Sequence, residues 1–139
     1  MPQREPGCLF CAILDGELPA IIVDEDERTI AFMDINPATR GHSLVIPRDH
    51  ATDLLDASPQ DVAAVAVAAQ RLAKLMPERL GADGVNLLNA CRPAAWQTVF
   101  HLHVHVIPRY ADDPLRLPWH PEPGDMDAIA AAGVALRGA

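Results

Sequence analysis

Apolar residues recur at helical spacing over one long segment in the middle of the chain. The apolar positions on one face of this segment are Val62, Val65, Ala69, Leu72 and Met76. Ser58 supplies an N-cap, Pro59 suits the first helical position, and Asp61 places an acid in the first turn. Gly81 is a stop signal, although Pro77 can end or kink the helix earlier. The pattern therefore predicts one long helix from residue 59.

Shorter apolar runs on both sides of this segment predict strands. The expected strands are residues 20–23, 29–33, 43–46, 85–88 and 99–107. The expected turn and loops are the acidic hairpin turn 24–27 and the loops 34–41 and 90–97. Residues 8–14 predict one or two helical turns and residues 127–136 a short final helix. Strand pairs on either side of one helix indicate an α+β fold, with an antiparallel sheet of about five strands, one long helix and short terminal helices.

Composition and charge narrow the function classes. The chain has 139 residues, which suits one domain, and 50% are hydrophobic and 22% charged, as in ordinary globular proteins. Eleven basic against 19 acidic residues give a net charge of −8, and no run of basic residues occurs. We therefore expect neither nucleic-acid nor membrane binding. The start of the chain has no secretory pattern, and no apolar run has membrane-spanning length.

The three cysteines, Cys8, Cys11 and Cys91, form an odd set in a chain without a secretory pattern. This predicts reduced thiols and a cytoplasmic protein. The pair Cys8-x-x-Cys11 lacks the neighbouring βαβ pattern that a thioredoxin-like redox motif needs. Two thiolates at this spacing can also bind zinc, but a closed zinc site then needs two further ligands.

Alternate residues in the last predicted strand are histidines. On a strand, His101, His103 and His105 share one face, and the apolar residues between them share the other. Three interpretations compete: a polar solvent-facing strand, a three-histidine catalytic zinc site, or nucleophilic catalysis by an imidazole beside groups that hold a phosphate.

The residues around these histidines favour the third interpretation, through a resemblance to a known family. The segment 101–107, with Gln97-Thr98 upstream, resembles the signature of the histidine triad family of nucleotide hydrolases and transferases. Residues 34–50 and 8–11 resemble two further segments of its bacterial, Hint-like members. The resemblance covers residues 8–109 as one domain, with 110–139 as a C-terminal tail. One departure is Trp96, at a position where the family commonly has glycine.

The resemblance implies roles for individual residues. His103 would attack the phosphorus of a nucleoside monophosphate linkage and form a nucleotidyl-histidine intermediate, which water then hydrolyses. The phosphate would be bound by the side chains of His105, His42, Thr98, Gln97 and Asn89. Asp34 would accept hydrogen bonds from the ribose hydroxyls. An apolar slot for the base would be formed by Leu9, Phe10, Ile13, Phe32 and Ile35.

The resemblance also implies a cofactor and partners. Cys8, Cys11, His50 and His101 would hold a structural Zn²⁺ with no open position, so the chemistry itself would need no metal. The expected ligand is a purine nucleotide such as AMP or GMP, and the expected assembly is a homodimer. A phosphoramidase is favoured over a dinucleoside polyphosphate hydrolase. A non-catalytic, zinc-stabilised nucleotide-binding module is the alternative from another class.

Overall fold

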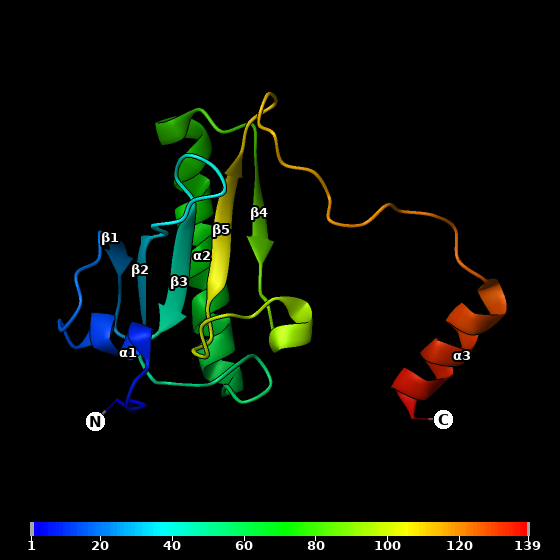
Figure 1. The fold of residues 1–139 in the computed structure, drawn as a ribbon, viewed down its shortest axis with the longest axis horizontal. Coiled ribbons are helices and arrows are strands. Elements are labelled where there is room, and N and C mark those ends of the chain that lie inside the picture. The colour runs from blue at the N-terminus through cyan, green and yellow to red at the C-terminus, as the bar shows by residue number, and fades with distance from the viewer. Residues whose placement is uncertain (1, 139) are drawn as a thin grey trace.

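The computed structural model describes residues 2–138, which form a sheet-and-helix body followed by an extended arm (Figure 1). The helices are α1 (Leu9–Leu14), α2 (Pro59–Leu80), the 3₁₀ turn η1 (Pro93–Ala95) and α3 (Met126–Arg137). The strands are β1 (Ile22–Glu25), β2 (Thr29–Met33), β3 (Ser43–Pro47), β4 (Gly84–Leu88) and β5 (Val104–Arg109). All strand pairs are antiparallel, in the order β1-β2-β3-β5-β4, which confirms the predicted fold class.

The long helix begins and ends as the sequence predicts. The Ser58 hydroxyl accepts the amide N–H of Asp61 at 3.1 Å, which caps the first turn. Gly81 ends the helix in the left-handed conformation, with φ 71°, where glycine carries no Cβ penalty. Pro77 does not end it, because Met76 and Leu80 on either side of the proline pack against the core and hold the last turn in place.

The inner strands of the sheet are buried on both faces. On one face Ala31, Val45 and Val106 pack against α2. On the other face Ile30 and Leu44 pack under α1, together with neighbouring apolar side chains. These residues alternate along each strand, so the pleat divides them between the two layers. The second layer is where the histidines lie.

The first and the last predicted strand have different bounds in the structure. The first strand covers Ile22–Glu25 rather than 20–23, because the Asp26 side chain accepts the amides of Arg28 and Thr29 and so moves the turn later. The last strand covers Val104–Arg109 rather than 99–107, and Pro108 lies inside it. Residues 99–103 have no ladder partner, since β3 pairs with β5 only over residues 104–106.

The final helix α3 forms near its predicted position but stands away from the body at the end of an extended arm (Figure 1). Every described residue of α3 is exposed, including apolar side chains. Among residues 2–138, no helix is long and apolar enough to cross a membrane.

Candidate functional site

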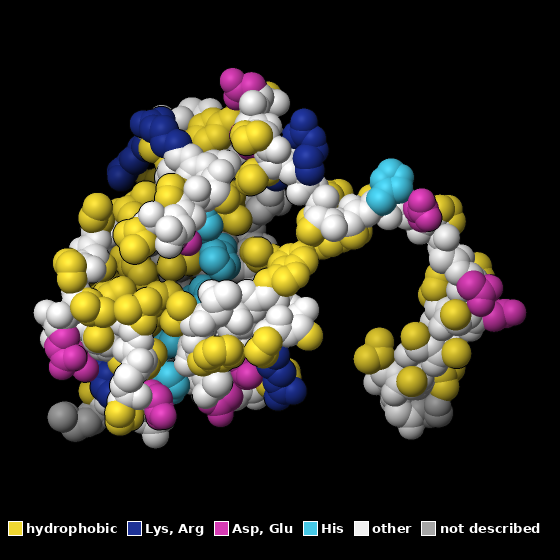
Figure 2. Space-filling view, viewed as in Figure 1, with side chains coloured by type: hydrophobic (Ala, Val, Ile, Leu, Met, Phe, Trp, Pro, Cys, Tyr) yellow, Lys and Arg dark blue, Asp and Glu magenta, His cyan; other side chains and the backbone are white. Residues whose placement is uncertain are grey.

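Four histidines lie together along the first residues of β5 and the neighbouring strand β3. His101 and His103 lie just before β5, His105 lies on it, and His42 directly precedes β3. The ring centroids of His103 and His105 are 5.0 Å apart, and those of His42 and His105 are 5.1 Å apart. His101 is fully buried, His42 and His103 are nearly so, and His105 is partly exposed. Figure 2 shows histidine side chains in a line between hydrophobic side chains of the body.

A backbone carbonyl fixes the tautomer of His103. The Nδ1 atom of His103 lies 2.7 Å from the carbonyl oxygen of His101. A carbonyl can only accept, so Nδ1 carries the proton and Nε2 keeps its lone pair. The amide of Asn89 donates to the carbonyl of His103 at 2.9 Å and holds the same residue from the β4 side. His103 therefore has a nucleophilic or basic nitrogen in a fixed orientation.

A backbone amide fixes the tautomers of the other two catalytic candidates. The N–H of Ala38 donates to Nδ1 of His42 at 2.9 Å, so the proton of a neutral His42 ring is on Nε2. That Nε2–H faces Nδ1 of His105 at 2.9 Å. His105 therefore accepts through Nδ1 and carries its own proton on Nε2. Each ring can thus remain neutral while His105 still offers a donor to a ligand.

Burial keeps these imidazoles neutral. It lowers the pKa of His103 and His42 below the usual value of 6.5, with Asp34 acting in the opposite direction. Burial first, and then the neighbouring histidines, lower the pKa of His105 to about 4. At neutral pH the row is therefore uncharged, as an imidazole nucleophile requires.

The free energy of unfolding should fall as the pH drops from about 6.5 to about 4. In this window unfolded His105 binds a proton that the folded protein excludes, so each such proton costs about 1.4 kcal/mol per pH unit. The His105→Gln variant should show a pH slope smaller by about that amount. Urea unfolding at pH 4.5, 5.5 and 7 measures it. Equal slopes in the two proteins would contradict this assignment.

A cleft of about 500 Å³ connects the histidines to an apolar slot. Its lining includes Leu9, Ile13 and Phe32, with Phe10 beneath them stacking edge-on to His103 at 5.2 Å between centroids. Ile35, which is 88% exposed, and the side chains of His103 and His105 also line it. The five residues expected around a base thus line one cleft with the histidines. The sequence pattern had given no sign of Leu18, Pro19 and Val99, which also line it.

Of the polar residues expected to bind the phosphate and the ribose, some line the cleft and others do not. Thr98 and Asp34 line the cleft. One Asp34 oxygen accepts the amide of Asn36 at 2.8 Å, and the other lies 3.4 Å from Nε2 of His42. Gln97 is buried, and both of its polar atoms are bonded to backbone groups of neighbouring loops.

Cys8, Cys11, His50 and His101 come together beneath the histidine row, with their ligand atoms within 4.8 Å of one another. The Cys8 and His101 atoms are 3.4 Å apart, as are those of Cys11 and His50, and the two Nδ1 atoms are 3.2 Å apart. Bonds of about 2.3 Å to sulfur and 2.0–2.1 Å to nitrogen give tetrahedral edges of about 3.5 Å and about 3.3 Å. The four ligands therefore fit one zinc ion.

The tautomer of His101 agrees with this fit. Its Nε2 lies 3.0 Å from the carbonyl oxygen of Pro47, so Nε2 carries the proton and Nδ1 has a free lone pair that faces the thiols. In a second compact set, Asp34, His42 and His105, the nitrogen of His42 that faces the other members has no free lone pair. The Ala38 amide leaves the proton of His42 on the nitrogen that would have to bind the ion. That set is a hydrogen-bonded network.

Fold and site together define an α+β protein whose buried histidines lie between an apolar cleft and a Cys2His2 cluster. The HIT domain model matches residues 15–112, and the chain belongs to this family. An uncharacterized HIT-like protein of Mycobacterium tuberculosis is 44% identical over 108 residues, 78% of this chain and 75% of the relative. An adenylylsulfatase of Arabidopsis thaliana is 38% identical over 106 residues, which are 76% of this chain and 54% of that protein.

Two solved structures extend the likeness. A protein of Streptococcus mutans superposes with a TM-score of 0.92 and 34% identity, covering 99% of this chain and 88% of that one. A histidine triad family protein of Mycobacterium smegmatis, described as Zn-bound, has a TM-score of 0.77 and 43% identity over 95% of this chain and 96% of that one.

Proposed function

We propose that the protein is a nucleotide hydrolase or transferase that cleaves a nucleoside monophosphate linkage through a covalent intermediate on His103. The observation that carries this is the His103 ring, whose Nδ1–H is held by the His101 carbonyl at 2.7 Å. Its free Nε2 belongs to a neutral ring, and the residue lines the cleft with the apolar slot. The adenylylsulfatase activity named for the Arabidopsis relative also involves an adenylyl group and supports this reaction class.

The chemistry follows from the fixed protons. The lone pair on Nε2 attacks phosphorus as the bond from phosphorus to the leaving group breaks, and the leaving group takes the bonding electrons and, where it is an amine, a proton from water. As the ring becomes cationic, the hydrogen bond from Nδ1 to the carbonyl of His101 strengthens. The Nε2–H of His105 and the hydroxyl of Thr98 are placed at the cleft to stabilise phosphoryl oxygens. Water then attacks the intermediate and releases the nucleoside monophosphate, with a purine such as AMP or GMP in the apolar slot.

The test is detection of the intermediate. We expect incubation with an adenosine 5′-phosphoramidate, followed by an alkaline quench, to leave one AMP group on the peptide that carries His103. Mass spectrometry of the digested protein measures this. Turnover of dinucleoside polyphosphates in place of phosphoramidates would favour the alternative hydrolase. Nucleotide binding without turnover of either substrate would favour a non-catalytic module.

We further propose a structural Zn²⁺ at Cys8, Cys11, His50 and His101. The edge lengths of the four-atom cluster and the His101 tautomer support it, as does the zinc-bound Mycobacterium smegmatis relative. The cluster supplies four protein ligands, so it has no position for a reacting water. Thiolate ligands also suit the reducing cytoplasm.

We also propose that two copies of the chain form a homodimer. Residues 117–137 expose apolar side chains at Leu117, Trp119, Met126, Ile129, Val134 and Leu136. A lone helix of 12 residues is marginal in water, so α3 needs a surface to pack on. It stands away from the body of its own chain (Figure 1), and the partner that we propose for it is a second copy. The Streptococcus mutans structure, which matches nearly the whole chain, supports the same course for the arm.

Charging the arm should separate the two copies. The double variant Ile129→Glu, Val134→Glu removes two apolar contacts from each arm, each worth about 1.5–3 kcal/mol. We expect the dimer dissociation constant to rise at least about 100-fold, measured by light scattering over a concentration series. Lys74→Glu, on the exposed face of α2, is the matched control and should leave the mass unchanged. A wild-type monomer would contradict the proposed assembly.

A further inference from the structure

The loop before Thr98 contains two residues in a conformation that L side chains rarely adopt. Of the non-glycine residues that the structure describes, Arg92 and Trp96 have positive φ, at 74° and 78°. They flank the 3₁₀ turn η1 on its two sides. A bulky residue in this region is a backbone outlier, and such outliers concentrate at functional sites.

Gln97 holds this conformation in place. Its side-chain oxygen accepts the amide of Arg92 at 2.6 Å, and its side-chain nitrogen donates to the carbonyl oxygens of Thr52 at 2.8 Å and Val99 at 3.1 Å. The residue is 4% exposed, so water does not compete for these bonds. The loop is therefore rigid, although its conformation is unfavourable for tryptophan. Glycine or asparagine would adopt φ 78° more readily.

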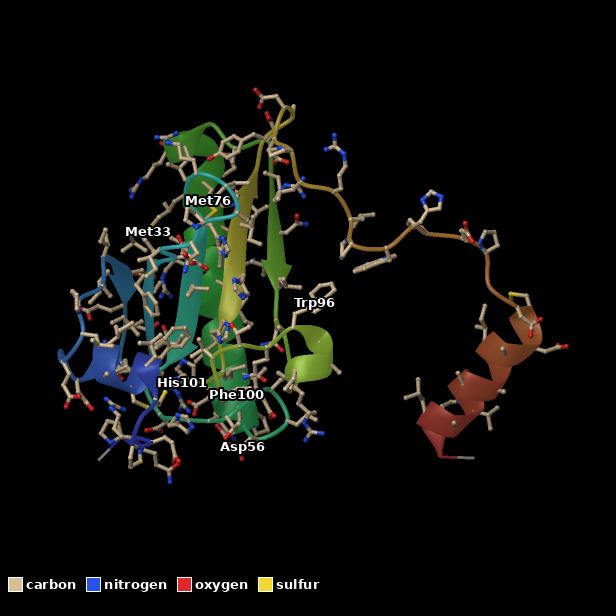
Figure 3. The ribbon with its side chains drawn as sticks, viewed as in Figure 1. Met33, Asp56, Met76, Trp96, Phe100 and His101 are labelled. Carbon is tan, nitrogen blue, oxygen red and sulfur yellow. The ribbon has the colours of Figure 1, made fainter. Side chains whose placement is uncertain are left out.

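The rigid loop holds an aromatic ring in solvent beside the reacting centre. Trp96 is 58% exposed, although burial of a ring of this size in the core would be favourable. It is two residues before Thr98, which lines the cleft, so their Cα atoms are within about 7.6 Å. In Figure 3, Trp96 lies on the opposite side of β5 from α1. The base slot is on the α1 side, so the histidines lie between that slot and the indole.

We propose that Trp96 is a specificity residue that stacks against an aromatic leaving group. The inference rests on the proposed function: with the nucleoside in the slot on the α1 side and His103 at the phosphorus, the leaving group extends toward η1. An indole has only two side-chain torsions to fix on binding, and its exposed ring presents a face to any planar ring. The substrates favoured by the site are therefore nucleoside phosphoramidates whose amine carries an aromatic ring, over those whose amine carries only an alkyl chain.

The experiment compares two substrates that share AMP and differ in the amine, tryptamine or n-propylamine. Trp96→Asn keeps a residue that tolerates positive φ but removes the ring, and Trp96→Phe keeps a ring. We expect Trp96→Asn to lower kcat/KM about 10-fold for the tryptamine compound and by less than about twofold for the propylamine compound. Trp96→Phe should retain most of the preference. Val67→Ala, which removes an exposed apolar side chain on α2, should leave the ratio unchanged.

The possible results separate this inference from the proposed function. An unchanged ratio in a folded Trp96→Asn protein, or equal loss on both substrates, would overturn the stacking role. Loss of the dimer in Trp96→Asn, with both activities lowered, would assign the ring to the subunit interface instead. A wild-type protein without His103-dependent turnover of either compound would overturn the proposed function, and the stacking role with it.

Discussion

Replacing His103 by alanine is expected to lower kcat for an adenosine 5′-phosphoramidate at least about 1000-fold, because removal of a nucleophile leaves only binding and electrostatic stabilisation. His105 and Thr98 remain in the cleft of this variant, so AMP binding should persist within about 10-fold. Steady-state kinetics gives the first quantity and calorimetric titration with AMP gives the second. The contrast between lost turnover and retained binding identifies the nucleophile.

The control for His103→Ala is His120→Ala, which removes an 87% exposed imidazole in the arm. It should leave kcat within about twofold. Circular dichroism and zinc content must match the wild type in both variants. Equal turnover in His103→Ala and wild type would reject the covalent mechanism. Loss of turnover on chelation, with the fold intact, would instead favour a zinc hydrolase that uses the triad histidines as ligands.

Loss of the metal centre is expected to have the largest effect on stability. Cys11→Ser removes a buried sulfur from the four-ligand cluster, and with it the zinc ion that we propose His50 and His101 to share. We expect the free energy of unfolding to fall by about 3–5 kcal/mol, and Tm by about 10 °C or more. Thermal melts with metal analysis measure both, and the wild type should bind one zinc ion per chain.

Cys91→Ser is the matched control for this effect, because Cys91 is a free, half-buried cysteine outside the cluster. Its Tm should stay within about 2 °C of the wild type. Extraction of zinc from the wild type should reproduce the loss seen in Cys11→Ser. Identical melting curves before and after complete extraction would show that the four residues do not hold a stabilising ion.

Local signals were enough to predict the framework of the fold. The cap at Ser58 and the stop at Gly81 define α2, because both act through backbone groups within a few residues. Alternation along β2 and β3 divides the apolar residues between the two faces of the sheet, and it too is a local property. The regular spacing of the three histidines likewise indicated that they would gather in one row.

Tertiary contacts determine the conformation of residues 99–103 and the histidine tautomers, which the sequence pattern could not predict. Residues 99–103 have strand composition, yet they run as an irregular segment where β3 offers them no pairing. The protons on the histidines are set by the amide of Ala38 and the carbonyls of His101 and Pro47. Backbone groups have no sequence signature, so neither the nucleophilic nitrogen nor the distinction between the two compact ligand sets could be predicted.

His101 takes part in both the Cys2His2 cluster and the histidine row of the cleft. Its ring belongs to the Cys2His2 cluster, and its carbonyl orients the ring of His103. Binding that restricts the motion of His103 therefore also restricts His101, and binding at His101 restricts His103. By thermodynamic reciprocity, any factor by which bound zinc raises the affinity for a nucleotide is the factor by which the nucleotide raises the affinity for zinc. With the proposed zinc site and nucleotide cleft, the supply of metal and the supply of substrate would then act on one another through His101.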